Sequence, residues 1–368
     1  MTLTPDLPYW LALEAVPGLG PEAVRRLLER FGGVQAIFSS PLDALRGCVS
    51  QPLAEAIGAS RPEPGNPAFA VTLDWLAAPD AHFIPCTDPT YPAALAQTPG
   101  APAWLYVKGD PGILAQPMLA IVGSRNATPQ GRRDAAAFAQ TLAEAGLTVV
   151  SGLAEGIDTA AHEGGLTGNG RGVAVVGTGL DRVYPARNRA LAHRLAASGC
   201  IVSEFPLGTP PRPGHFPRRN RVISGLALGV LVIEAAPQSG SLITARLAAE
   251  QGREVFALPG SIHSPLSRGC HRLIKDGAKL VESAADILDE LAWQWSPPAR
   301  ADWDDDSGPK DDPILALLGP EPVSLDALVA ASGLTVDRLS AILLAHELDG
   351  RIAALPGGLY QRLYPGTD

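Results

Sequence analysis

The stretch "MLAIVGSRNATPQGRRDAAAFAQTLAEAGLTVVSG", residues 118–152, decides the fold. A short apolar run opens it, a segment of helical composition follows, and a second apolar run ends at Ser151-Gly152. Further apolar runs come later, namely "GVAVVGTG", "CIVSEF", "GVLVIEAA" and "EVFALPG", and helical segments alternate with them. Short, continuously apolar strands that alternate with helices are typical of a parallel sheet covered on both faces. The sequence therefore predicts a doubly wound, mostly parallel, Rossmann-like α/β domain.

The 368 residues suggest two or three domains. We expect a helical domain over residues 1–75, the α/β domain over residues 80–295, an acidic linker over residues 296–312 and a winged helix over residues 313–368. The first of these contains "LEAVPGLGPEAVRRLLERFGG", a glycine hairpin followed by a helix. This pattern fits a helix-hairpin-helix or SAM-like unit that offers backbone N–H groups to a phosphate, and it fits a plain αα-hairpin equally well.

The C-terminal segment has the order helix, helix, helix and then two short strands around Pro356-Gly357-Gly358, which indicates a winged helix. Its third helix, "TVDRLSAILLAHELDG", carries one Arg against two Asp and one Glu. A recognition helix normally needs positive charge against phosphates. We therefore interpret this unit as a structural or protein-contacting module, with DNA binding as the alternative.

The net charge of −9 is unevenly distributed along the chain. Residues 116–290 carry a net charge of +3, whereas the remainder carries −12. A mildly basic centre is compatible with an anionic ligand, because screening makes charge effects local, over about 8 Å.

The apolar runs are too short for a membrane span, and the N-terminus lacks the pattern of a secretory signal. The four cysteines show no CxxC spacing. We expect a cytoplasmic protein without disulfides or a structural zinc.

Small residues stand where the predicted strands end, which is where an open parallel sheet places its ligand crevice. They are Gly123-Ser124-Arg125, Ser151-Gly152, Gly177-Thr178-Gly179, Ser239-Gly240-Ser241 and Gly260-Ser261. Small side chains let backbone N–H groups and helix N-termini approach an anion closely. Their repetition predicts a track for several phosphates. The GxGxxG and Walker GxxxxGK[ST] motifs are both missing, which disfavours a redox enzyme or a P-loop NTPase. We expect no cofactor.

The segment "GHFPRRNRVISG", residues 214–225, places an aromatic residue beside a basic cluster. That cluster consists of Arg218, Arg219 and Arg221. We expect a loop that becomes a helix near Arg218, so that the three arginines cannot all face one ligand. Phe216 precedes a proline and is predicted to be an exposed stacking surface. Arginines beside an exposed ring are typical of single-stranded nucleic-acid binding. The alternative is that they pair with carboxylates such as Glu204 and Glu234.

No group of residues in the sequence clearly indicates a catalytic site. Asp158 and His162 lie four apart on one helical face, a spacing that permits an acid–base pair. We favour a structural role, in which the two support each other and the loop at Ser151-Gly152. Neither a GxSxG elbow nor an HExxH motif accompanies them, and Cys270-His271 need not face each other. We predict no enzyme, no catalytic residues and no metal site.

Taken together, these blocks resemble the DNA-processing protein A family (DprA, also called Smf). Those that match in order are "VGSRNATPQG", "VVSGLAEGIDTAAHEGGL", "YPARNRAL", "FPRRNRVISGL", "SGSLITARLAAEQGREVFALPGS" and "DGAKLV". The resemblance implies a homodimer that binds single-stranded DNA and loads RecA onto it during natural transformation, with single-strand-binding protein as a further partner. The family's DNA pocket then falls on Gly123, Ser124, Arg125, Ser151, Gly152, Phe216, Arg219 and Asn220, with Ser239, Gly240 and Ser241 nearby. Arg218 and Arg221 complete the set, either as DNA contacts or as residues that shape the loop.

One position departs from the family pattern, since "GCHRLI" has His271 where the family usually has Asn. This puts a local hydrogen bond in doubt. A rival function is that of the lysine-decarboxylase-like Rossmann enzymes, which cleave nucleoside monophosphates as phosphoribohydrolases. Their PGGxGTxxE signature does not match "QSGSLITARLAAE". A scaffold that binds only proteins is the remaining alternative.

Overall fold

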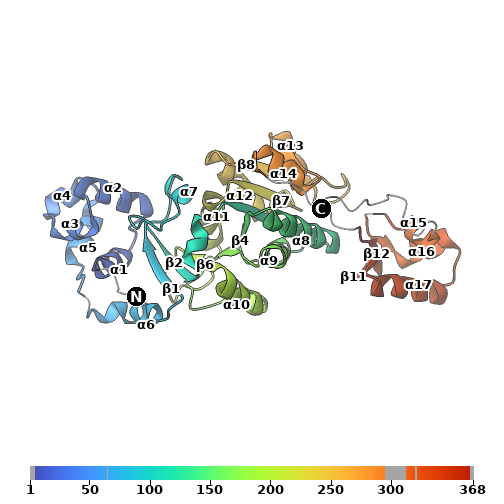
Figure 1. Cartoon of the computed structure of the whole chain (residues 1–368), viewed down its shortest axis with the longest axis horizontal. Coiled ribbons are helices and arrows are strands. Elements are labelled where there is room, and N and C mark those ends of the chain that lie inside the picture. The colour runs from blue at the N-terminus through green and yellow to red at the C-terminus, as the bar shows by residue number, and fades with distance from the viewer. Residues whose placement is uncertain (1–4, 64, 295–311, 320, 365–368) are drawn as a thin grey trace.

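The computed structural model describes residues 5–63, 65–294, 312–319 and 321–364. Figure 1 shows three parts in a row, with N-terminal helices at one end, an α/β core in the middle and a small C-terminal unit at the other end. The predicted acidic linker, residues 296–312, lies outside the described residues except for Asp312.

One large sheet of nine strands forms the core, in the order β1-β2-β6-β5-β4-β3-β7-β8-β9. The strands are β1 (Ala81–Pro85), β2 (Trp104–Gly109), β3 (Met118–Gly123), β4 (Thr148–Ser151), β5 (Val173–Val175), β6 (Cys200–Ser203), β7 (Gly229–Ile233), β8 (Glu254–Ala257) and β9 (Lys279–Leu280). Every neighbouring pair from β6 to β9 is parallel. The β1–β2 pair is antiparallel, and β2 runs antiparallel to β6. The predicted doubly wound, mostly parallel sheet is confirmed.

Helices cover both faces of this sheet because its central strands are apolar on both sides (Figure 1). One face packs against α8 (Pro129–Glu144), α9 (Ile157–Gly168) and α14 (Ala284–Glu290). The other packs against α7 (Ala93–Ala96), α11 (His215–Leu226), α12 (Gly240–Glu250) and α13 (Arg268–Lys275). Helix α10 (Arg189–Ser198) packs on β5 and β6, and the short turns η2 (Pro111–Ala115) and η3 (Ala186–Asn188) join neighbouring elements.

The strand order reverses beside β3. From β3 the chain builds outward through β4, β5 and β6, and then it returns to add β7, β8 and β9 on the opposite side of β3. Adjacent loops after β3 and β7 therefore leave the sheet in opposite directions and open a crevice between them. Such a switch point is where open α/β sheets bind their ligands.

The N-terminal helices have an apolar cluster of their own, which extends onto Ala103 beside β2. They are α1 (Leu7–Glu14), α2 (Pro21–Phe31), α3 (Val34–Ser39), α4 (Leu42–Arg46), α5 (Gln51–Ala59), η1 (Pro67–Phe69) and α6 (Ala70–Leu76). Pro21 opens α2, and Gly32, with φ +80°, ends it in the left-handed conformation that glycine adopts most readily.

The C-terminal unit is a winged helix, as predicted. Its elements are α15 (Pro313–Leu317), β10 (Val323–Ser324), α16 (Leu325–Ser332), α17 (Val336–Leu348), β11 (Ile352–Leu355) and β12 (Leu359–Arg362). The three strands form a small antiparallel sheet. In the described part of the chain, no single helix has the length and hydropathy of a membrane span, although the pair α16 and α17, bent by 110°, passes that test by length and composition.

Candidate nucleic-acid interface

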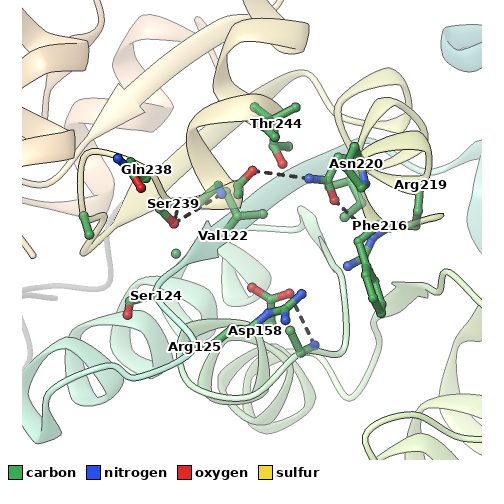
Figure 2. A pocket seen from close by; sticks show the side chains of 18 of the residues that line it. Val122, Ser124, Arg125, Asp158, Phe216, Arg219, Asn220, Gln238, Ser239 and Thr244 are labelled. Atoms are coloured by element: carbon green, nitrogen blue, oxygen red, sulfur yellow. Dashed lines mark hydrogen bonds between the residues drawn. The ribbon is translucent and has the colours of Figure 1, made fainter. Parts of the chain in front are cut away.

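A cleft of about 820 Å³ opens at the switch point, between the loop after β3 and the loop after β7. Figure 2 shows its side chains around one open space, with Ser124 and Arg125 on one side and residues of α11 and the start of α12 on the other. Nine of the thirteen predicted site residues line it, namely Gly123, Ser124, Arg125, Phe216, Arg219, Asn220, Ser239, Gly240 and Ser241. The structure thus brings together residues that are more than 100 positions apart in the sequence.

Close packing at the end of β3 fixes the first side of the cleft. A Cβ atom on Gly123 would lie 1.8 Å from the Ile233 carbonyl oxygen, so only glycine fits between β3 and β7 here. The next residue, Ser124, donates its backbone N–H to the Glu234 carbonyl oxygen at 2.7 Å. This bond ties the two loops together. Arg125 follows on an exposed turn, and its guanidinium carbon lies 5.2 Å from the centre of the Phe216 ring, a cation–π distance.

Helix α11 begins at His215, three residues before the predicted start at Arg218. The His215 ring stacks on Phe205 with 4.4 Å between ring centres, and its Nδ1 atom lies 3.2 Å from the Gly177 carbonyl oxygen. These contacts hold the first turn of the helix against the sheet. Phe216 is consequently half-buried rather than fully exposed, with its ring lining the cleft.

The side chain of Arg219 is buried, with 5% of its surface exposed. Its Nη1 atom donates to the carbonyl oxygens of Gly152 and Val175, and its Nε atom donates to Asn220 Oδ1 at 3.1 Å. Burial is the main cause that lowers the pKa of this guanidinium, to about 10, while nearby Asp158 opposes the shift. Arg219 thus ties the ends of β4 and β5 to α11 and forms part of the cleft floor.

Asp158 supports the loop after β4, in line with the structural role expected for it. Its carboxylate accepts hydrogen bonds from the backbone N–H groups of Gly152, at 3.1 Å, and Ala154, at 3.4 Å. Burial raises the pKa of this carboxyl group, and the charge of Arg219 opposes that effect. His162 does not pair with it: both ring nitrogens are buried and lack a hydrogen-bond partner within the described residues.

The other two arginines of α11 pair with Glu204, which was one of the two carboxylates considered from the sequence. Arg218 Nη2 lies 3.2 Å from Glu204 Oε2, and Arg221 also bonds to that oxygen and to the Gly100 carbonyl. The Arg218 guanidinium also lies over the Phe205 ring at 5.1 Å. The lining of the cleft includes neither Arg218 nor Arg221. Glu234, the second candidate, instead accepts bonds from Thr128.

The opposite side of the cleft is the start of α12. Ser239 caps this helix by accepting the Ser241 N–H at 3.3 Å, and Asn220 Nδ2 donates to the Gly240 carbonyl oxygen at 3.3 Å. The positive end of the helix dipole therefore faces the space where an anion would lie. Ser151 lies outside the cleft, because its Oγ atom is buried and donates to Ile121 O at 2.6 Å. Gly152 lines a smaller adjoining niche.

Several lining residues were not predicted from the sequence. Asn126, Gln238 and Thr244 add polar groups to the cleft, and Tyr184 adds an exposed ring. The block "YPARNRAL" that contains Tyr184 was recognised, but no local pattern indicates that this loop folds back towards α11. A tertiary contact decides it, since the Tyr184 and Phe216 ring centres lie 5.9 Å apart.

Comparison with known families identifies the chain. Residues 82–292 match the model described as DNA recombination-mediator protein A, and residues 296–358 match the DprA winged helix domain. The chain belongs to the DNA recombination-mediator protein A family. Two similar proteins are both called Smf. The one from Escherichia coli is 46% identical to this chain, and the match covers 79% of this chain and 80% of the relative. The one from Synechocystis is 35% identical, and the match covers 96% of this chain and 98% of the relative.

Solved structures of the family share the fold. DprA from Streptococcus pneumoniae superposes with a TM-score of 0.68 and 38% identity, over 79% of this chain and 99% of that one. A structure of DNA processing protein A from Helicobacter pylori, described with a single-stranded DNA binding mode, gives a TM-score of 0.52 and 30% identity. This match covers 56% of this chain and 94% of that one. The position where this chain departs from the family pattern keeps a hydrogen bond, because His271 Nε2 lies 3.0 Å from the Gly260 carbonyl oxygen.

Proposed function

We propose that this protein binds single-stranded DNA in the cleft between the β3 and β7 loops. The observation that carries the proposal is the convergence, at one switch point, of an exposed arginine over an aromatic ring and the N-terminus of a helix. A cation and a helix N-terminus suit phosphates, and rings suit stacked bases. The reported binding mode of the Helicobacter pylori relative, at 30% identity, supports the same ligand.

We assign different roles to the predicted residues according to their exposure and their hydrogen bonds. Arg125 is exposed and can reach a phosphate, as can the N–H groups at the start of α12. Phe216 offers its ring to a base. Arg219 and Asn220 hold the cleft in shape through their bonds to strand ends and to Gly240. Arg218 and Arg221 act on the loop through Glu204 rather than on DNA.

Family membership leads us to propose the wider role as well. In it, the protein loads RecA onto incoming single strands during natural transformation, acts as a homodimer in the cytoplasm and contacts single-strand-binding protein. We assign no catalytic residue. We retain the domain boundaries proposed from the sequence, at 1–75, 80–295, 296–312 and 313–368.

A salt-titrated binding assay with single- and double-stranded oligonucleotides tests the DNA proposal. We expect a preference for single strands and a linear fall of log affinity with log salt, with a slope of about 0.7 for each neutralised phosphate. Equal affinity for both forms, or binding that salt does not weaken, would overturn the proposal. The RecA step is tested separately, by following RecA filament formation on strands coated with single-strand-binding protein, with and without this chain.

A release assay with nucleoside monophosphates distinguishes the rival phosphoribohydrolase function. Free base released in proportion to protein would favour the enzyme, and no release together with single-strand preference favours the DNA-binding role. Binding to RecA without any DNA preference would favour the scaffold.

A further inference from the structure

The winged helix carries a groove of its own, separate from the DNA cleft. The groove has a volume of about 740 Å³, which is within the range of roughly 300–1,000 Å³ that ligand pockets have. Its lining comes from α15, from the end of α16 and the turn after it, from α17, and from Arg351 just before β11 (Figure 1). No described residue of the α/β core lines it, so the core does not cover this groove.

The floor of the groove is apolar. Ile314 is buried, Leu334 and Ile342 are half-buried, and Leu317 has 37% of its surface exposed. Covering such side chains removes apolar surface from water, which favours association. An exposed apolar surface with polar residues at its rim is typical of a site that binds another protein.

Two arginines stand beside this apolar floor. Arg338 lies four residues before Ile342, on the same face of α17, and Arg351 follows the end of that helix. Within the described part of the chain, neither guanidinium has an ion-pair or hydrogen-bond partner. Both groups are therefore available to a ligand, and guanidinium groups bind carboxylates with two parallel hydrogen bonds.

The carboxylate that lines the groove, that of Asp312, is already engaged. Its Oδ2 atom lies 2.8 Å from His346 Nε2, and its Oδ1 atom accepts the Ile314 N–H at 3.1 Å, which caps α15. Asp312 thus points to groups of its own domain and does not neutralise the two arginines. The unpaired charge of the groove is positive, and a complementary ligand is acidic as well as apolar.

Nucleic acid fits this surface poorly, although it is also anionic. The exposed positions on α17 and at its end include Asp337, Glu347 and Asp349. A duplex that lay along this helix would bring its phosphates to these carboxylates. A short peptide needs only the groove, where its apolar side chains can cover the floor.

We propose that this groove binds an acidic peptide segment of another protein. The carboxylates of the segment pair with Arg338 and Arg351, and its apolar side chains pack on Leu317 and Ile342. The inference goes beyond the proposed DNA binding, because it gives the winged helix a ligand of its own and makes it the part that recruits a partner protein.

Fluorescence anisotropy on the full chain tests the proposal, with a short labelled peptide in which pairs of Asp alternate with Leu, Ile and Phe. We expect saturable binding that weakens as salt rises, because exposed charge pairs are screened. One control peptide has Lys in place of every Asp, and another has Ser in place of every apolar residue. Each control should bind at least about tenfold more weakly, since it lacks one of the two complementary features.

Variants of the groove locate the binding. We expect Arg338→Glu combined with Arg351→Glu to weaken binding of the acidic peptide at least about tenfold, because like charges then face each other. Leu317→Asp should also weaken it. The matched controls are Arg30→Glu, an exposed arginine of α2, and Leu348→Asp, a leucine of α17 that is 79% exposed and does not line the groove. Both controls should bind like the unmodified protein, and circular dichroism checks that every variant is folded.

Peptide binding within about twofold of the unmodified protein in both groove variants would overturn the proposal. Tighter binding after Asp304, Asp305 and Asp306 are replaced by Ser would also overturn it, because the occupant would then be the chain's own acidic segment. Displacement of the peptide by double-stranded DNA would assign the groove to nucleic acid. Self-association of the unmodified chain that the double arginine variant abolishes would assign it to a second copy. All these results leave the cleft untouched, because the DNA proposal fails only if the unmodified protein shows no single-strand preference.

Discussion

Arg125 and Arg219 line the same cleft, but the side chain of Arg125 is exposed and that of Arg219 is buried. Arg125 is exposed, and its nearest described aromatic partner is Phe216. Arg219 is buried, with its donors on main-chain carbonyls and its charge offset by Asp158. A buried cation that is already hydrogen-bonded has little left to offer a phosphate, and removing it leaves its partners unsatisfied. Replacing Arg125 should therefore weaken DNA binding, whereas replacing Arg219 should lower the stability of the fold.

We expect Arg125→Ala to lower the salt slope of single-strand binding by about 0.7, the contribution of one phosphate. Arg219→Ala should leave that slope nearly unchanged and instead reduce the free energy of unfolding by about 3–5 kcal/mol, the usual cost of breaking a buried charge pair. Salt-titrated binding and urea unfolding measure the two effects. Arg194→Ala, whose arginine pairs with Glu163 away from the cleft, is the control. A salt slope reduced by Arg219→Ala and not by Arg125→Ala would reverse these assignments.

The resemblance places Arg219 among the DNA-binding residues, whereas its side chain is buried and donates to main-chain carbonyl oxygens. Helical spacing predicts that Arg218, Arg219 and Arg221 cannot all face one ligand. Which of the three side chains points into the protein depends on where helix α11 begins. Contacts of His215 with Phe205 and Gly177 fix that start, and both partners are distant in the sequence. Of the five strand-end groups expected to form a phosphate track, those at Gly123 and Gly240 line the cleft, whereas those at Gly177 and Gly260 do not and Gly152 lines only the adjoining niche. A buried strand followed by small residues indicates the ligand crevice of a parallel sheet, but not which strand ends face it.

His162 makes stability depend on pH. Burial is the main cause that lowers the pKa of this imidazole from 6.5 to about 3, and Arg219 contributes in the same direction. Between these values the unfolded chain binds a proton that the folded chain does not, so stability falls as the pH drops below 6.5.

We expect the unmodified protein to lose about 1.4 kcal/mol more than His162→Leu between pH 7.5 and pH 5.5, since one pKa unit corresponds to about 1.4 kcal/mol. Urea unfolding at the two pH values measures this, and the comparison with the variant cancels the other titrating groups. Parallel losses in both proteins would mean that His162 is protonated in the folded state.

At the scale of elements, α8 and α9 pack unusually closely because α9 contains glycines. A Cβ atom on Gly164 would lie 2.1 Å from the Ala136 carbonyl oxygen, and one on Gly168 would lie 2.6 Å from Gln140 O. Glycine within a helix costs about 0.5–1 kcal/mol relative to alanine. The close helix contact offsets this cost and holds the N-terminus of α9, with Asp158, beneath the cleft.

Gly164→Ala should therefore destabilise the protein by about 1–3 kcal/mol, as overpacking of a filled core does, although alanine is the better helix former. Thr167→Ala, at an exposed position of the same helix, should change stability by less than about 0.5 kcal/mol. The measurement is urea unfolding followed by circular dichroism. Greater stability of the Gly164 variant would mean that α8 and α9 have room to separate.

The sequence predicted the elements better than it predicted their contacts. The helix in "AEGIDTAAHEGGL" and the strand in "LTVVSG" follow from local composition, and both are confirmed. The antiparallel strands β1 and β2 were not predicted, because they flank or lie in a proline-rich stretch and their pairing is tertiary: β1 pairs with β2, and β2 pairs with β6. Strand order as a whole is set by crossovers, which no single segment encodes.

At the scale of the molecule, the winged helix is attached to the core by α8. Arg133 donates through Nη2 to the Gly350 carbonyl oxygen at 3.0 Å and through Nη1 to Tyr364 O at 3.3 Å. In addition, Gln130 Oε1 accepts the Tyr364 N–H at 2.9 Å. Beside these bonds, Leu355 and Pro356 line a pocket of about 620 Å³ together with Arg125 and Arg132. The winged helix thus lies next to the residue expected to hold phosphate.

A few hydrogen bonds make a weak attachment, so the arrangement of the two units should respond to a single substitution. A hydrogen bond to a charged group contributes about 1.5–3 kcal/mol, and Arg133→Ala removes two. We expect the variant to shift towards conformations with the winged helix away from α8, at least tenfold in the equilibrium, which would increase the maximum dimension measured by small-angle X-ray scattering. Gln140→Ala is the control on the same helix, since Gln140 bonds to Glu144 and not to the winged helix. Scattering curves that coincide for the unmodified protein and both variants would mean that other contacts hold the winged helix, and binding to single strands should then be insensitive to Arg133 as well.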